Sequence, residues 1–225
     1  MQEADRSLRR DVGAIALASG AVGVSFGAIA VASGVSPLLT VLMSLVIFAG
    51  GAQFLAVGLM AAGNPFAAVV AGLLLNARHL PFGLALGATL DGGPARKLLG
   101  SHLMVDESVA FALARPDGPA RRRAYWMTGG SLFVCWNVGA GLGVLLGGVA
   151  GDTDRFGLDA AFPAGLFGLI LPSLRDRETR AVALTGAAVA LASTPFLPAG
   201  LPVLLALTGL VCIPLTRRTR VDARS

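Results

Sequence analysis

Three polar residues, Asn76, Arg78 and His79, lie within an apolar stretch that runs from Pro65 to Leu90. A charged side chain at the depth of a bilayer costs about 2.5–3.5 kcal/mol on insertion scales and usually faces a cavity or a partner. Pro81 follows closely and cannot donate a backbone hydrogen bond, which favours a helix break there. Transporters build midplane binding sites from polar groups at broken helices. We therefore predict that these three residues bind substrate, with Arg78 contacting a carboxylate.

A structural role is the alternative for the same residues. Asn76 and His79 could hydrogen-bond to neighbouring helices, and Arg78 could extend its charged end to the membrane surface.

A second polar position is Gln53, which closely follows the adjacent glycines Gly50 and Gly51. Two glycines weaken a helix, and an amide can donate to a carboxylate and accept from an ammonium. We predict that this break meets the one near Pro81 and completes the substrate site. Helix–helix bonding by Gln53 is the alternative.

Two further polar groups are candidates. Trp136 and Asn137 interrupt a later apolar run and are predicted to face the same cavity. His102, Asp106 and Glu107 form a cluster in which His102 and Asp106 are spaced i, i+4 and could pair. A carboxylate in such a place could carry a proton during transport, so these three are the proton-coupling candidates. If their segment lies at the membrane surface, they are solvated groups with no such role.

The composition indicates a membrane protein. The chain has 225 residues, of which 55% are hydrophobic and 14% charged, whereas soluble proteins carry about 25% charged residues. The net charge of +5 lies in short tracts between apolar runs, as the positive-inside rule expects, and no nucleic-acid-binding motif occurs. No catalytic, cofactor or metal motif occurs either, so we expect neither an enzyme nor a cofactor.

The apolar runs predict an all-α polytopic protein with about seven transmembrane segments, six to eight, including broken or re-entrant helices. We expect residues 1–11 to be a cytoplasmic tail, residues 12–215 to be one membrane domain, and residues 216–225 to be a basic cytoplasmic tail. Within the domain, residues 91–124 form a basic cytoplasmic connection with an amphipathic helix. Residues 95–115 either lie on the membrane or form a short polar span.

The Lys and Arg residues favour one topology. If residues 38–62 form a broken hairpin that returns to the outer side and 95–115 stay on the inner surface, 16 of the 18 basic residues lie inside. If both segments span, 14 lie inside and three outside. Both versions place the two termini in the cytoplasm.

Glycines recur at helical spacing in two runs. Gly13, Gly20, Gly27 and Gly34 follow one another every seven residues, and Gly139, Gly143 and Gly147 every four. Such faces allow close helix packing in membranes. An internal repeat is suggested only by Phe48-Ala-Gly-Gly and Phe162-Pro-Ala-Gly-Leu, one in each half.

With these residues identified, the chain resembles the AzlC family, the large subunit of branched-chain amino acid exporters. The resemblance covers nearly the whole chain and rests on the order and spacing of six pieces: Phe26-Gly27, Phe48-Ala-Gly-Gly-Ala-Gln-Phe54, Asn76-Ala-Arg78-His79, Asp106-Glu107, Trp136-Asn137 and Gly157-Leu-Asp-Ala-Ala-Phe-Pro163. Phe82 stands where such proteins would be expected to have a tyrosine.

The resemblance implies a multi-pass protein of the bacterial cytoplasmic membrane that exports valine, leucine, isoleucine and methionine. It also implies a small AzlD-type partner of about four membrane segments. We expect alternating access around the site described above. The alternatives are a membrane scaffold subunit with no pathway of its own and a channel for small neutral solutes.

Overall fold

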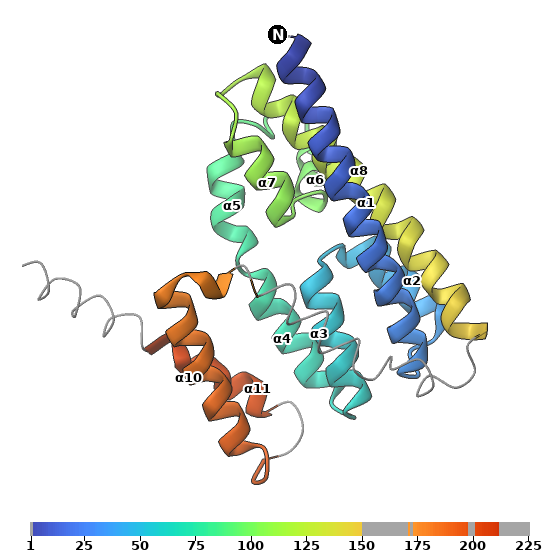
Figure 1. Cartoon of the computed structure of the whole chain (residues 1–225), viewed down its shortest axis with the longest axis vertical. Helices are drawn as coiled ribbons and strands as arrows, with labels where there is room; N and C mark the ends of the chain where they lie inside the picture. The colour runs from blue at the N-terminus through green and yellow to red at the C-terminus, as the bar shows by residue number, and fades with distance from the viewer. Residues whose placement is uncertain (1, 150–170, 172, 198–200, 212–225) are drawn as a thin grey trace, which may run out of the picture.

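The computed structural model describes residues 2–149, 171, 173–197 and 201–211, and these are helical with no strand. Figure 1 shows the arrangement. The elements are α1 (Gln2–Ala32), α2 (Pro37–Ile47), α3 (Gly50–Ala61), α4 (Pro65–Asn76), α5 (His79–Leu86), α6 (Pro94–His102), α7 (Asp106–Leu113), α8 (Pro119–Val149), η2 (Ser173–Arg175), α10 (Arg177–Ser193), α11 (Leu201–Leu205) and η3 (Ala206–Val211). The prediction of an all-helical membrane protein with broken helices is confirmed.

Three stretches of the described chain are long and apolar enough to cross a bilayer: Asp5–Ala32, Pro65–Leu86 and Pro119–Gly147. Large apolar side chains on them are exposed, among them Leu17, Phe66 and Leu84, as expected of surfaces that face lipid rather than water. α1 begins at Gln2, so the polar N-terminal residues extend the first apolar helix.

The longest helices, α1 and α8, pack side by side and run parallel (Figure 1). Contacts between the two helices follow the same order in both, from the Asp5–Arg123 ion pair near their N-terminal ends to the approach of Ala28 and Gly147 near their C-terminal ends. Glycines make this approach possible, because a Cβ added at Gly23 would lie 2.6 Å from the carbonyl oxygen of Trp136. The predicted packing faces are confirmed at Gly20, Gly27, Gly139, Gly143 and Gly147, whereas Gly13 and Gly34 have open space around them.

Residues 38–62 form two short helices instead of one span. At 1.5 Å per residue, α2 and α3 measure about 16 and 18 Å, roughly half of the hydrocarbon core. The break lies at Phe48 and Ala49, where Phe48 has the left-handed backbone φ 42°, ψ 49°. Gly50 and Gly51 were expected in the break, but they begin α3. α2 rises from the end of α1 and α3 returns, before α4 and α5 run opposite to α1 (Figure 1).

The predicted break in the third apolar run is present at Ala77 and Arg78, between α4 and α5. Pro81 was expected to free the carbonyl of Ala77, but that carbonyl accepts a hydrogen bond from the Leu80 amide at 3.1 Å. Pro81 lies in the first turn of α5, where its missing N–H breaks no helical bond.

Residues 95–115 contain α6 and α7 rather than one helix, and Leu103, Met104 and Val105 separate them. Neither is long enough to cross the bilayer. α6 is anchored to α8 by the Tyr125 hydroxyl, which donates to the carbonyl of Gly100 at 2.6 Å. Two sequence predictions fall outside the described residues: the piece at 157–163 with the suggested repeat at Phe162, and the tail 216–225.

Candidate functional site

A cavity of about 440 Å³ lies where the three helix breaks meet α1 and α8. Ligand pockets in proteins measure about 300–1,000 Å³, so this space suits a small molecule. The cavity is lined by Ile15, Ala18, Ser19, Val22, Ser25, Phe48, Ala49, Gly50, Gly51, Phe54, Arg78, Val105, Asp106, Glu107, Leu132 and Trp136.

The cavity lies at the middle of the spanning helices. On α1 it is lined by residues 15–25 of the candidate span Asp5–Ala32. On α8 it is lined by Leu132 and Trp136, which are central in Pro119–Gly147. A space at the centre of two parallel spans is at the depth where transporters hold their substrates.

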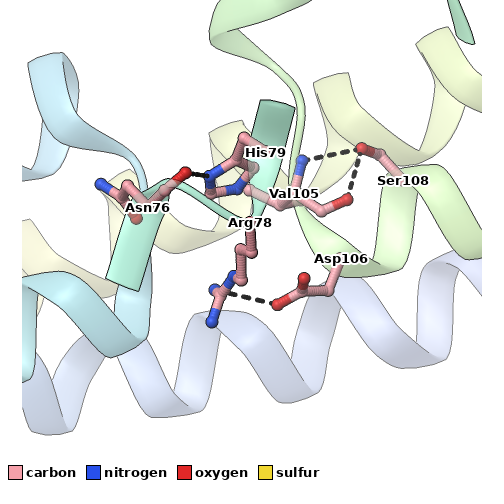
Figure 2. Close-up of polar contacts among 6 residues, drawn as sticks. All are labelled: Asn76, Arg78, His79, Val105, Asp106 and Ser108. Atoms are coloured by element: carbon pink, nitrogen blue, oxygen red, sulfur yellow. Dashed lines mark hydrogen bonds and ion pairs between the residues drawn. The ribbon is translucent and has the colours of Figure 1, made fainter. Parts of the chain in front are cut away.

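Arg78 and Asp106 form an ion pair on the wall of this cavity. Arg78 Nη2 lies 2.9 Å from Asp106 Oδ2, and Figure 2 shows the two side chains directed toward each other from separate helix breaks. The Arg78 side chain is 34% exposed, although its Nε is buried without a partner in the described structure. One N–H group of the guanidinium is therefore without an acceptor in the described structure, although it is shielded from solvent.

The break between α6 and α7 positions the carboxylates. The Ser108 hydroxyl accepts from the Val105 amide at 3.0 Å and lies 2.9 Å from the Val105 carbonyl, to which it can donate (Figure 2). Asp106 and Glu107 then occupy the first turn of α7, where the helix dipole favours negative charge. Glu107 also lines the cavity and has no ion pair within the described part of the chain.

The apolar wall opposite these charges is built by aromatic rings. Trp136 stacks on Phe26 with ring centroids 5.8 Å apart and meets Phe54 edge-on at 6.4 Å. Gly50 lets the indole approach, because an added Cβ would come within 2.9 Å of the Trp136 ring. Gly50 and Gly51 thus shape the cavity because they have no side chains that would fill it.

Gln53 does not line the cavity. It is fully buried, and both of its amide atoms lack a partner among the described residues. The cavity reaches Arg78 but not Gln53, so the direct contact expected between this amide and a substrate is absent from this conformation.

Asn76 and His79 also lie outside the cavity lining. His79 Nδ1 donates to the backbone carbonyl of Asn76 at 2.9 Å, across the break between α4 and α5 (Figure 2). Their local contact holds the turn that carries Arg78. In this conformation the two residues lie beside Arg78 but not on the cavity, and their direct contact with substrate stays a prediction.

Asn137 and His102 have structural partners instead. The Ser44 hydroxyl donates to Asn137 Oδ1 at 2.7 Å, which joins α2 to α8. The His102 ring packs 5.5 Å from Phe133 and 6.2 Å from Phe48. The predicted pairing of His102 with Asp106 does not occur, because the non-helical residues between α6 and α7 remove the i, i+4 relation.

The cavity lining on α1 was missed by the sequence analysis. Ile15, Ser19, Val22 and Ser25 recur every three or four residues and share one face. The two serines within an otherwise apolar run were the available signal. Within the described residues, no group of three His, Cys, Asp or Glu side chains could hold a metal ion.

Comparison with known proteins gives a consistent result. A family model described as AzlC protein matches residues 14–150. The chain is 27% identical over 205 residues to the branched-chain amino acid transport protein AzlC of Bacillus subtilis, covering 85% of this chain and 78% of that protein. It is 29% identical over 133 residues to an uncharacterized membrane protein of Haemophilus influenzae, covering 57% and 54% respectively. No solved structure gives a significant match.

Proposed function

Because the chain belongs to the AzlC family, we propose that it is a transporter subunit that exports branched-chain amino acids across the bacterial cytoplasmic membrane. A similar protein of Bacillus subtilis carries the name of a branched-chain amino acid transport protein. Membrane residence agrees with the three long apolar helices.

The observation that carries this proposal is one basic side chain in a mid-depth cavity with apolar walls. Arg78 supplies the group that binds an α-carboxylate. Phe54, Leu132 and Trp136 supply apolar surface for a branched side chain. Gly50 and Gly51 leave room for the ligand beside the Phe48 break.

Transport proceeds by alternating access in this proposal, with the cavity open to one side of the membrane at a time. Both termini lie in the cytoplasm, and a small AzlD-type subunit completes the transporter. Asp106 and Glu107 remain the candidates for proton coupling, because they are carboxylates that line the cavity.

The test is counterflow of labelled valine in liposomes that contain the chain with its small partner subunit. We expect Arg78→Ala to reduce exchange at least about tenfold, since a hydrogen bond to a charged group contributes about 1.5–3 kcal/mol and about 1.4 kcal/mol is a factor of ten. Arg10→Ala is the matched control, because Arg10 also pairs with an Asp, Asp11, but is exposed and does not line the cavity.

Parental exchange by a folded, assembled Arg78→Ala complex would refute the site. Absence of saturable valine exchange in the parental complex would favour the scaffold alternative. The burial of Gln53 and the Ser44–Asn137 hydrogen bond between helices are also consistent with that alternative.

A further inference from the structure

The guanidinium of Arg78 already holds a carboxylate, that of Asp106. The function proposed above requires the same guanidinium to hold the carboxylate of the substrate. The Asp106 carboxylate therefore occupies, or lies next to, the position on Arg78 that a substrate carboxylate would take.

We propose that a zwitterionic ligand separates this ion pair, its carboxylate taking Arg78 and its ammonium taking Asp106, with Glu107 as the second ammonium acceptor. This inference rests on the proposed function and adds the ammonium subsite to it. No covalent step is involved, and the exchange replaces one ion pair with two.

The charges of the cavity support the exchange. An unpaired charge at mid-depth is costly, and in the empty cavity Arg78 and Asp106 neutralise each other at 2.9 Å. A zwitterion brings both signs, so neither side chain is left without a partner when the pair opens. A carboxylate without an ammonium would strand Asp106 beside Glu107, and an amine without a carboxylate would strand Arg78.

Two further contacts point to a ligand that carries both charges. Glu107 lines the cavity without an ion pair in the described structure, so it can accept from an ammonium without losing another charged partner. Arg78 Nε is buried, so an arriving carboxylate reaches the exposed end of the guanidinium, where Nη2 now holds Asp106. The cavity therefore offers carboxylate oxygens that can accept from an ammonium and guanidinium N–H groups that can donate to a carboxylate.

The geometry also permits Asp106 to move. Its side chain is 49% exposed, and among the described residues its one ion pair is the contact with Arg78. Asp106 directly follows the non-helical residues between α6 and α7. Rotation of this side chain needs no change in the helices.

The experiment measures competition with labelled valine exchange in liposomes that contain the full chain and its partner subunit. Unlabelled valine is compared with isovalerate, which has only the carboxylate, and with isobutylamine, which has only the ammonium. In the parental complex we expect each of the two to compete at least about tenfold more weakly than valine, because each strands one charge.

The variant Asp106→Asn separates the proposal from a purely structural role. We expect valine to bind about tenfold more weakly, because its ammonium loses a charged partner. Isovalerate should compete more strongly than in the parental complex, because Arg78 is no longer neutralised. Asp91→Asn is the matched control, since Asp91 pairs with Lys97 at 3.3 Å outside the cavity and both side chains are exposed.

Three results overturn the proposal. The first is that isovalerate competes as well as valine in the parental complex, a result that needs no variant. The other two concern the Asp106→Asn complex: valine and isovalerate both compete more weakly by the same factor, or valine competes as it does in the parental complex. If the parental complex shows no saturable valine exchange at all, the proposed function itself fails. Failure of the proposed function is thereby distinguished from failure of the ion-pair proposal.

Discussion

Two buried polar side chains differ in how their hydrogen-bonding groups are satisfied. Gln53 and Ser108 are both fully buried, but the Gln53 amide has no partner in the described structure, whereas the Ser108 hydroxyl bonds to the backbone at Leu103 and Val105. A buried group without a partner costs about 1–3 kcal/mol. The buried Gln53 amide therefore destabilises the folded protein in this conformation, whereas the Ser108 hydroxyl stabilises it.

We expect Gln53→Met to raise the free energy of unfolding by about 1 kcal/mol, because the apolar side chain fills a similar space without stranded polar atoms. Ser108→Ala should lower it by about 1 kcal/mol, because the Val105 amide loses its acceptor. Thermal unfolding in detergent measures both. Loss of stability in Gln53→Met would show that the amide has a partner that this conformation lacks.

At the scale of elements, glycine faces hold α1 and α8 together while helix breaks open the cavity beside them. A Cβ at Gly143 would collide with the Val24 carbonyl oxygen and lie 2.8 Å from the Ala28 amide nitrogen. Gly141, two residues away on the same helix, has nothing within 4 Å of the same position. The two glycines thus have the same helical backbone but different surroundings.

We expect Gly143→Ala to destabilise the protein by about 1–3 kcal/mol, because overpacking forces the two helices apart. Gly141→Ala should be neutral or stabilising by up to about 1 kcal/mol, since alanine is the better helix former. Chemical unfolding in detergent compares the two. Equal effects of both substitutions would contradict the parallel α1–α8 interface.

At the scale of the whole molecule, α1 presents different residues to the cavity and to the outer surface. Ser19 faces the cavity on α1, whereas Leu17, two residues before it, is 74% exposed on the outer surface. The parallel course of α1 and α8 requires the chain between them to cross the membrane once in return. The α4–α5 pair is the one stretch between them that is long and apolar enough to do so.

This arrangement predicts different reactivity for cysteines introduced at the two positions after Cys135→Ala and Cys212→Ala. We expect Ser19→Cys to react with a water-soluble maleimide at least about tenfold faster than Leu17→Cys, because only thiolates in water react readily. Valine should slow the reaction of Ser19→Cys by occupying the cavity. Equal labelling at both positions, unaffected by valine, would contradict a water-filled substrate cavity.

Much of the element-level structure follows from the sequence alone. Apolar length fixes the membrane class, and a pair of glycines or a proline weakens a helix wherever it occurs, so breaks in residues 38–62 and 65–90 could be predicted. Their location could not be predicted to the residue. Proline is tolerated in a first helical turn. Phe48, which has the left-handed backbone, packs 5.0 Å from Phe133, a residue far away in the sequence.

The partners of the polar residues were decided by the tertiary structure. Sequence spacing specifies neighbours only within one continuous helix, so it paired His102 with Asp106, which a break separates. It also grouped Gln53 and Asn76 with Arg78, because residue type alone does not reveal whether a side chain reaches a cavity. Arg78 meets Asp106 across 28 positions of sequence because two helix breaks converge at mid-depth. That convergence depends on the packing of α4 against α3, of α7 against α8, and of α1 against both α3 and α8, which no local pattern records.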